Sequence, residues 1–381
     1  MQGLSGLPRK LMREHLLVLF ITAALTYLLT PLAEKAALRF GAIAYVRNRD
    51  VHTTPTPRWG GLAIWVAIAI SIGIANQLPL LHKAFAQTGQ ITGIVIASGI
   101  VLLLGMADDR WGLDAITKLA GQSIAAGVLL LNGVQLLWLP INGITTLPSS
   151  LGQLLTILVI LVSINAVNFV DGLDGLAAGI VAIAAVAFFS YAYLLSVVYN
   201  FDRAGAPLLI TAVVVGACIG FLPHNFYPAR IFMGDSGSMV LGLLLGVAAI
   251  TLTGQIDSNA ISAQQLAPTL LPILLPFGVL AIPLIDLISA IIRRTKAGRS
   301  PFAPDKEHLH HRIILLGHSQ RSATFLLYLW TFSFAMPLAA SAFIPWRFTL
   351  LVSLFFIALS LSFTKYPFLY RKLKVGVLKN I

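Results

Sequence analysis

Residues 176–199, which read LAAGIVAIAAVAFFSYAYLLSVVY, are the stretch of sequence that decides the fold. The stretch holds no charged residue and no proline. As an α-helix rising about 1.5 Å per residue, it is long enough to cross a hydrocarbon layer of roughly 30 Å. A helix also pairs its internal backbone N–H and C=O groups, for which lipid offers no partners. The stretch therefore predicts a transmembrane helix.

Similar apolar runs recur along the whole chain. The 381 residues are 57% hydrophobic and 10% charged, with a mean hydropathy of +0.87, whereas soluble domains are about 25% charged. The gaps are too short to fold alone, so residues 1–381 are expected to form one all-α, polytopic membrane domain with about eleven transmembrane helices. The predicted spans are 16–32, 62–78, 91–107, 116–131, 151–166, 176–199, 207–222, 236–253, 270–292, 323–343 and 348–363.

The net charge of +12 reports topology and not a nucleic-acid partner. Most of the Lys and Arg residues fall in the gaps after alternate spans, so the positive-inside rule places these gaps in the cytoplasm. The expected location is the plasma (inner) membrane. Most of the 14 acidic residues fall in the same gaps. Carboxylates and bases gathered at one membrane face predict a cytoplasmic site that binds phosphate through a metal ion.

The first acidic motif is the pair Asp108-Asp109, which ends the run 91–107 and is followed by Asp114 and Lys118. Two adjacent carboxylates at a membrane edge repel each other unless a cation joins them. The alternative is that these aspartates cap helix ends in the interface. The pair alone leaves both interpretations open.

Two further motifs lie in gaps on the same side. The segment 168–175, NFVDGLDG, brings together Asn168, Asp171 and Asp174, and its glycines allow close backbone approach, which favours a polar ligand or cation over a capped turn. The segment 230–238, RIFMGDSGS, places Asp235 at the start of a predicted helix. This aspartate is either an N-cap or a docking point for Mg²⁺ and phosphate.

Two basic loops complete the set. The segment 305–312, DKEHLHHR, places His308 and His311 on one helical face, and with Arg312 close by and no cysteine it suits an anion better than zinc. A solvated basic loop is the alternative. The segment 52–61, HTTPTPRWGG, offers His52 and Arg58 to phosphates and contains no Walker motif. Asp286, inside a predicted span, is assigned a structural or supporting role.

Taken together, the motifs resemble the polyprenyl-phosphate N-acetylhexosamine-1-phosphate transferase family, glycosyltransferase family 4, which includes the phospho-MurNAc-pentapeptide translocase. The motif-bearing region is 52–312, and the resemblance runs from about Pro55 to Arg312 and follows the family's order of loops. It implies that Asp235 and Asp109 bind Mg²⁺, with Mn²⁺ as an alternative, and that Asp108, Asp109 and Asp174 are catalytic. The residues that it assigns to substrate binding are Lys118, Asn168, Asp171, Phe232, His308, His310, His311, Arg312, Arg58 and His52.

The histidine loop suggests which branch of the family applies. The translocase branch has three consecutive histidines, whereas this chain reads His-Leu-His-His-Arg. This difference favours the GlcNAc-1-phosphate branch and leaves the choice among UDP-N-acetylhexosamines open. The implied partners are a UDP-sugar, undecaprenyl or another polyprenyl phosphate, and membrane lipid, and a homodimer is compatible with the sequence.

The implied reaction is attack of a polyprenyl phosphate on UDP-GlcNAc, with UMP released, for the synthesis of cell-envelope polysaccharide. Asp108 is expected to deprotonate or orient the attacking phosphate. A covalent phospho-sugar intermediate on a carboxylate is the alternative route. From other functional classes, a multi-span transporter and a scaffold protein remain as rivals, although the acidic residues gather at one face and no internal repeat is visible.

Overall fold

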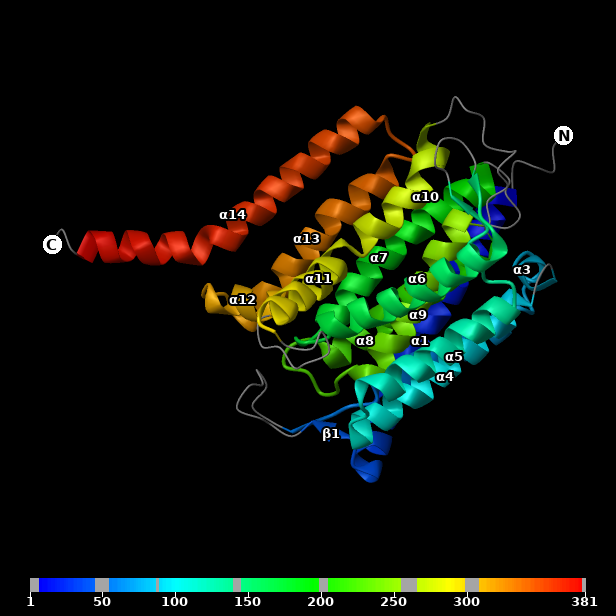
Figure 1. Ribbon diagram of the computed structural model, residues 1–381, viewed down its shortest axis with the longest axis horizontal. Helices are drawn as coiled ribbons and strands as arrows, with labels where there is room; N and C mark the ends of the chain where they lie inside the picture. Colours follow the sequence, from blue (N-terminus) through cyan, green and yellow to red (C-terminus); the bar gives the residue numbers. More distant parts are fainter. Residues whose placement is uncertain are drawn as a thin grey trace.

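The computed structural model describes residues 7–44, 55–86, 89–139, 145–198, 205–254, 266–298 and 308–378, and these residues are almost entirely helical (Figure 1). The all-α, polytopic prediction is confirmed. The helices are α1 (Leu7–Phe40), α2 (Gly60–Ala75), α3 (Lys83–Ala86), α4 (Gln90–Trp111), α5 (Ala115–Leu131), α6 (Ser149–Val170), α7 (Leu176–Tyr193) continued by a π-helical turn η1 (Leu194–Val198), α8 (Gly205–Asn225), α9 (Gly234–Gly254), α10 (Leu266–Val279), α11 (Ala281–Lys296), α12 (Leu309–Leu315), α13 (Gln320–Ala340) and α14 (Trp346–Leu378).

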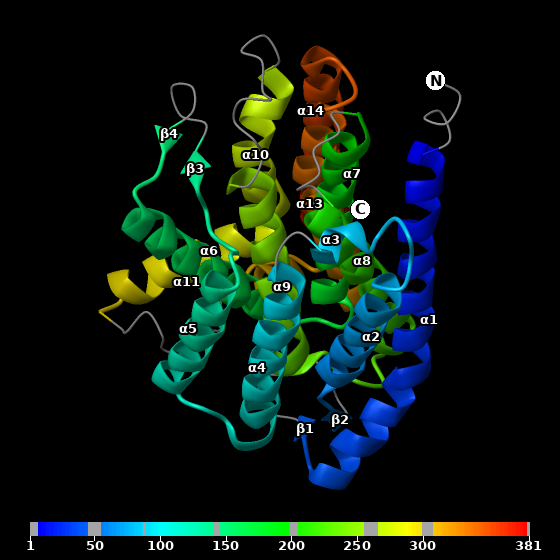
Figure 2. The same ribbon diagram turned by 90° about the vertical axis from the view of Figure 1, so that its right-hand side faces the viewer.

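Within the described residues, eight helices are long and apolar enough to cross a membrane, and α2 and α5 are shorter apolar helices. Two small antiparallel hairpins lie at opposite ends of the bundle (Figure 2). Strands β1 (Ile43–Ala44) and β2 (Thr56–Pro57) lie beside the α4–α5 turn, whereas β3 (Trp138–Leu139) and β4 (Thr145–Thr146) lie at the end that holds the N-terminus. The chain is therefore a multi-pass membrane protein, and the loops between its helices lie at the two ends of the bundle.

Helix α9 lies at the centre of the bundle, and its whole apolar window is buried. It packs against α4, α6, α2 and α8. Small residues allow this close packing, because a Cβ on Gly105 of α4 or on Gly61 of α2 would collide with the α9 backbone at Ser236 or Gly237. Glycine at such contacts is the usual way in which membrane helices approach closely.

The predicted span 270–292 is wrong as a single helix. The structure divides it at Leu280 into α10 and α11. The cause is Pro283, which has no N–H to donate to the carbonyl four residues earlier, at Val279, where α10 ends. In Figure 2 α10 runs along the bundle, whereas α11 lies across it. The break therefore lets α11 pack on α6 in a direction different from that of α10.

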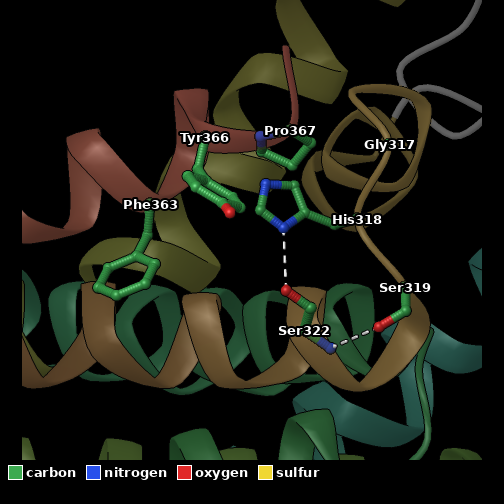
Figure 3. A pocket seen from close by; sticks show the side chains of 7 residues that line it. All are labelled: Gly317, His318, Ser319, Ser322, Phe363, Tyr366 and Pro367. Carbon is green, nitrogen blue, oxygen red and sulfur yellow. Dashed lines mark hydrogen bonds between the residues drawn. The ribbon is translucent and has the colours of Figure 1, made fainter. Parts of the chain in front are cut away.

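Helix α14 packs mainly on α13 and bends away from the bundle towards the C-terminus (Figure 1). A pocket of about 440 Å³ lies between the two helices (Figure 3). His318 crosses it, with Nδ1 3.0 Å from Ser322 Oγ and Nε2 3.2 Å from the Thr364 carbonyl. No residue predicted for the functional site lines this pocket.

Candidate active site

The centre of the site is the first turn of α9, which is held by Asp109 at the end of α4. Asp109 Oδ1 accepts a hydrogen bond from the Asp235 N–H at 3.0 Å, and Oδ2 accepts one from the Ser236 N–H at 3.1 Å. Residue 234 must be glycine, since its φ is +70° and a Cβ there would collide with the Asp109 carboxylate. A carboxylate at a helix N-terminus satisfies amides that the helix itself cannot pair.

Lys118 joins the two other carboxylates of this cluster. Its Nζ lies 3.1 Å from Asp108 Oδ2 and 3.1 Å from Asp235 Oδ2. Asp108 is fixed further because its Oδ1 accepts the Leu113 N–H at 2.6 Å, which closes the turn between α4 and α5. The structure thus brings together Asp108, Asp235 and Lys118, three residues that the sequence assigned to one site.

Asn168, at the end of α6, reaches the same turn of α9. Its Nδ2 donates to Ser238 Oγ at 2.9 Å, and its side chain also hydrogen-bonds Asp235. The α6 helix packs along α9, where Gly242 lies against the Ile164 backbone. Asn168 is therefore a member of the cluster and connects it to the 171–175 loop.

Arg58 brings a second basic group from the loop before α2. Its Nη1 lies 3.9 Å from Asp109 Oδ1. The loop docks on the segment before α9, because the Gly60 N–H donates to the Phe232 carbonyl at 3.0 Å and the Phe232 N–H donates back to Pro57 at 2.8 Å. Phe232, predicted to bind substrate, is thus fixed beside the cluster by its backbone.

Asp171 caps the C-terminal end of α6, and its carboxyl is close enough to Asp235 and Asp109 to be repelled by their charges. Desolvation of its carboxyl, together with repulsion from Asp235 and Asp109, raises the pKa of Asp171 to about 8. The nearby Arg58 opposes this shift. A carboxyl of this kind is largely neutral near pH 7 unless additional positive charge arrives.

The charge of the cluster bears on the predicted metal ion. Fully ionised, the four carboxylates carry more negative charge than the two bases can balance, which fits a divalent cation. In the described part of the chain, no group of three side chains is already arranged as a metal cage. Mg²⁺ usually keeps its waters and uses one or two carboxylates with substrate phosphates, so this donor set suits it. The carboxylates are Asp108, Asp109, Asp171 and Asp235, and the bases are Lys118 and Arg58.

Asp174, predicted to be catalytic, lies in a different environment. It is buried, its Oδ2 accepts the Ala229 N–H at 2.9 Å, and its carbonyl accepts the Thr324 hydroxyl at 3.4 Å. These contacts tie the 171–175 loop to α13 and to the segment that leads to Phe232. In this structure the contacts of Asp174 hold neighbouring loops together.

The histidine loop packs on the same 171–175 loop. A Cβ on Gly172 would collide with the ring of His310, which stacks with His308 and also contacts His311. Burial, with the neighbouring histidines, lowers the pKa of His310 to about 3, so this ring is neutral at physiological pH. Arg312 is exposed on α12. The structure therefore brings the loop to the site, with His310 as an uncharged packing residue.

One predicted residue, His52, lies outside the described residues. One supporting residue was not predicted: Asn225, at the end of α8, accepts the Gly175 N–H at 3.1 Å and donates to the Ile231 carbonyl at 3.0 Å. It joins two motif loops that are far apart in the sequence. Its sequence neighbours, Pro-His-Asn-Phe, give no periodic signal that would have identified it.

The comparisons with known proteins agree with this geometry. The family described as Glycosyl transferase family 4 matches residues 91–253, which contain the Asp108, Asn168 and Asp235 motifs. A decaprenyl-phosphate N-acetylglucosaminephosphotransferase of Mycolicibacterium smegmatis is 45% identical over 378 residues, covering 96% of this chain and 91% of the relative.

Two more distant relatives have similar descriptions. A probable undecaprenyl-phosphate N-acetylglucosaminyl 1-phosphate transferase of Bacillus subtilis is 33% identical, covering 92% of this chain and 90% of the relative. An undecaprenyl-phosphate alpha-N-acetylglucosaminyl 1-phosphate transferase of Escherichia coli is 25% identical, covering 77% and 75%. Since the similarity extends over nearly the whole chain and the motif residues gather at one end of the bundle, this chain belongs to glycosyltransferase family 4, among the polyprenyl-phosphate N-acetylglucosamine-1-phosphate transferases.

Proposed function

We propose that this enzyme transfers N-acetylglucosamine-1-phosphate from UDP-GlcNAc to a long-chain polyprenyl phosphate and releases UMP. The observation that carries the proposal is the cluster of Asp108, Lys118 and Asp235 at the N-terminus of α9, where Lys118 Nζ lies 3.1 Å from each carboxylate. Helix N-termini and fixed cations are suited to bind phosphate, and carboxylates are suited to bind the metal that accompanies it. The relatives' descriptions support the sugar and the lipid.

In the proposed reaction, an oxygen of the lipid phosphate attacks the β-phosphorus of UDP-GlcNAc. A new P–O–P bond forms, and the bond from the β-phosphorus to the bridging oxygen breaks, so that UMP leaves with the electron pair. Phosphoryl transfer of this type depends mainly on positioning and on neutralising charge. Lys118 and Arg58 supply fixed positive charge near the phosphates.

Asp108 has the role of orienting the acceptor phosphate or receiving its proton. Its contact with Lys118 and with the Leu113 N–H holds the carboxylate in one place. A lipid phosphate near neutral pH is already largely ionised, so orientation is expected to outweigh proton transfer. Direct displacement needs no acceptor side chain and is preferred here over a covalent intermediate.

We propose Mg²⁺, with Mn²⁺ as a substitute, as the cofactor and Asp235 as its principal protein ligand. When bound, such an ion neutralises diphosphate charge and stabilises the leaving group. Asp109 was predicted as a second ligand, but both of its oxygens already accept amides of α9. Its main contribution is therefore to orient the helix turn that carries Asp235.

The acceptor is proposed to be undecaprenyl or decaprenyl phosphate. Undecaprenyl phosphate follows from the sequence resemblance, and decaprenyl phosphate follows from the description of the M. smegmatis relative. The clustering of basic gaps at the site end supports a cytoplasmic active site in the plasma membrane. In that orientation the soluble nucleotide meets the cluster directly, while the polyprenyl tail stays in lipid.

The experiment is a transfer assay with purified protein in detergent, Mg²⁺ and either lipid phosphate. Labelled UDP-GlcNAc, UDP-GalNAc and UDP-MurNAc-pentapeptide serve as parallel donors. We expect lipid-linked label from UDP-GlcNAc together with released UMP, and little from the other two donors. Transfer from UDP-GalNAc or UDP-MurNAc-pentapeptide alone would reassign the sugar, and transfer from none would contradict the proposed reaction.

A further inference from the structure

Helix α11 belongs to none of the motifs that carry the proposed reaction, yet its buried face holds two charged residues. Asp286 is 3% exposed and Arg294 is 6% exposed, with Ala290 midway between them. Residues four apart on a helix share a face, and this face packs against α6. A charge is costly to bury, and a leucine could fill the same space more favourably. The position of Asp286 therefore calls for a specific role.

The Asp286 carboxylate contacts His308 and Leu309 of the histidine loop, one with each of its oxygens. Oδ2 lies 3.2 Å from His308 Nδ1, and Oδ1 accepts the Leu309 N–H at 2.8 Å. The first contact fixes one nitrogen of the imidazole. The second fixes the backbone where α12 begins. Within the described residues, the other ring nitrogen of His308, Nε2, makes no hydrogen bond.

Helix α11 also contacts the His308 ring indirectly, through Phe169. The ring of Phe169 lies 5.4 Å from the ring of His308, and the Arg294 guanidinium lies 5.3 Å from the Phe169 centroid. Asp286 and Arg294 thus form a clamp on two rings whose planes are tilted by 50°. Phe169 directly follows Asn168, whose side chain contacts Asp235. The clamp therefore connects α11, the histidine loop and the carboxylate cluster through adjacent contacts.

We propose that Asp286 is a positioning residue for donor binding: it accepts a hydrogen bond from His308 Nδ1, so that in the protonated ring Nε2–H is the donor left to meet the phosphates of a nucleotide-sugar. A carboxylate beside one imidazole nitrogen fixes the orientation of the ring and stabilises its doubly protonated form, in which both nitrogens donate. This inference rests on the proposed function. Asp286 lies outside the sequence motifs. Its proposed role concerns the nucleotide-sugar alone, whereas the carboxylate cluster acts on both substrates.

The test is the Asp286→Asn variant in the transfer assay, because asparagine keeps the size of the side chain and an acceptor for the Leu309 N–H. Loss of a charge-assisted hydrogen bond to a substrate-binding group should raise the KM for UDP-GlcNAc by about tenfold. We expect the KM for polyprenyl phosphate to stay within about twofold. A merely structural role would instead lower the amount of active protein and leave both KM values unchanged.

A double-mutant comparison sharpens the test. If Asp286 acts through His308, then Asp286→Asn should have little further effect on kcat/KM in a His308→Ala background. Additive effects of the two substitutions, or an unchanged KM for UDP-GlcNAc in Asp286→Asn, would overturn the inference. Thermal unfolding of each variant checks that it is folded.

The matched control is Glu14→Gln, which makes the same carboxylate-to-amide change at the other end of the bundle. There Glu14 Oε2 accepts the Leu80 N–H at 3.1 Å, so in each variant the new amide keeps an oxygen for one backbone N–H. Glu14→Gln should leave both KM values unchanged. If the parent protein transfers nothing from UDP-GlcNAc, the proposed function fails and this inference falls with it; if the parent is active and Asp286→Asn matches it, only this inference fails.

Discussion

Helices α9 and α14 have the same mean hydropathy over their apolar windows, 1.8, but lie in opposite environments. The window of α9 is 100% buried, whereas that of α14 is 11% buried. Helix α9 is rich in small residues where other helices cross it, and α14 presents large side chains such as Leu351 and Phe355 to the surroundings. Hydropathy therefore identifies a span, while the distribution of small residues indicates whether it lies in the core or faces lipid.

The largest effect is expected at the first turn of α9. Asp235→Ala removes a carboxylate that contacts Lys118 and is proposed to bind the metal. We expect transfer to fall by about three orders of magnitude, because electrostatic groups aligned with developing charge contribute on that scale. The measurement is the rate of UMP release at saturating substrates, compared with thermal unfolding to show that the variant folds. An active, Mg²⁺-dependent Asp235→Ala enzyme would remove this residue from the site.

The core position of α9 is tested by adding volume where α4 crosses it. Gly105→Val places side-chain atoms against the α9 backbone at Ser236 and should destabilise the protein by about 1–3 kcal/mol. The matched control is Gly73→Val on α2, where a Cβ meets nothing within 4 Å. Unfolding curves in detergent should separate the two variants clearly. Equal stability of both would contradict the close packing between α4 and α9.

A change in pH tests the electrostatics of the cluster beside α9. Because the folded pKa of Asp171 is raised to about 8, the native state holds a proton that the unfolded state has lost. The stability of the parent should therefore fall as the pH rises from about 4 to about 8 and then level off. Asp171→Asn removes the contribution of Asp171 to this dependence. Without Mg²⁺, the variant should unfold close to the parent's temperature near pH 4 and at a higher temperature near pH 9.

The smallest effect is expected on α14. Leu354 is 53% exposed on this helix, so Leu354→Ala should change the free energy of unfolding in detergent by no more than about 0.5 kcal/mol. The rate of transfer should also be unchanged, since α14 carries none of the residues assigned to the site. A loss comparable to that of a core leucine would show that α14 packs in the bundle more closely than its contacts indicate.

The sequence predicted the helical class and most of the spans because lipid imposes one strong requirement, an apolar helix of sufficient length. It failed at 270–292, where hydropathy is continuous but Pro283 breaks the backbone ladder. That failure also concealed the position of Asp286, since a residue in the middle of a straight span could not be expected to reach the histidine loop.

The sequence predicted which residues belong to the site, but it did not predict the separate role of each one. Asp108, Lys118, Asn168 and Asp235 were assigned to one place from their motifs, and the structure brings them together. What residue type alone does not reveal is that Asp109 accepts amides of a helix far along the chain. Such roles depend on which backbone groups a fold leaves unpaired, and these are known only once the helices are placed.

The most direct test of the central claim is the stoichiometry of one reaction by the purified parent protein. UDP-GlcNAc labelled in both the sugar and the uridine would be incubated with Mg²⁺ and either undecaprenyl or decaprenyl phosphate. The account predicts one UMP released for each sugar label that becomes lipid-linked, and neither product once a chelator is added. Lipid-linked sugar accompanied by UDP, or no lipid-linked label with either acceptor, would contradict it.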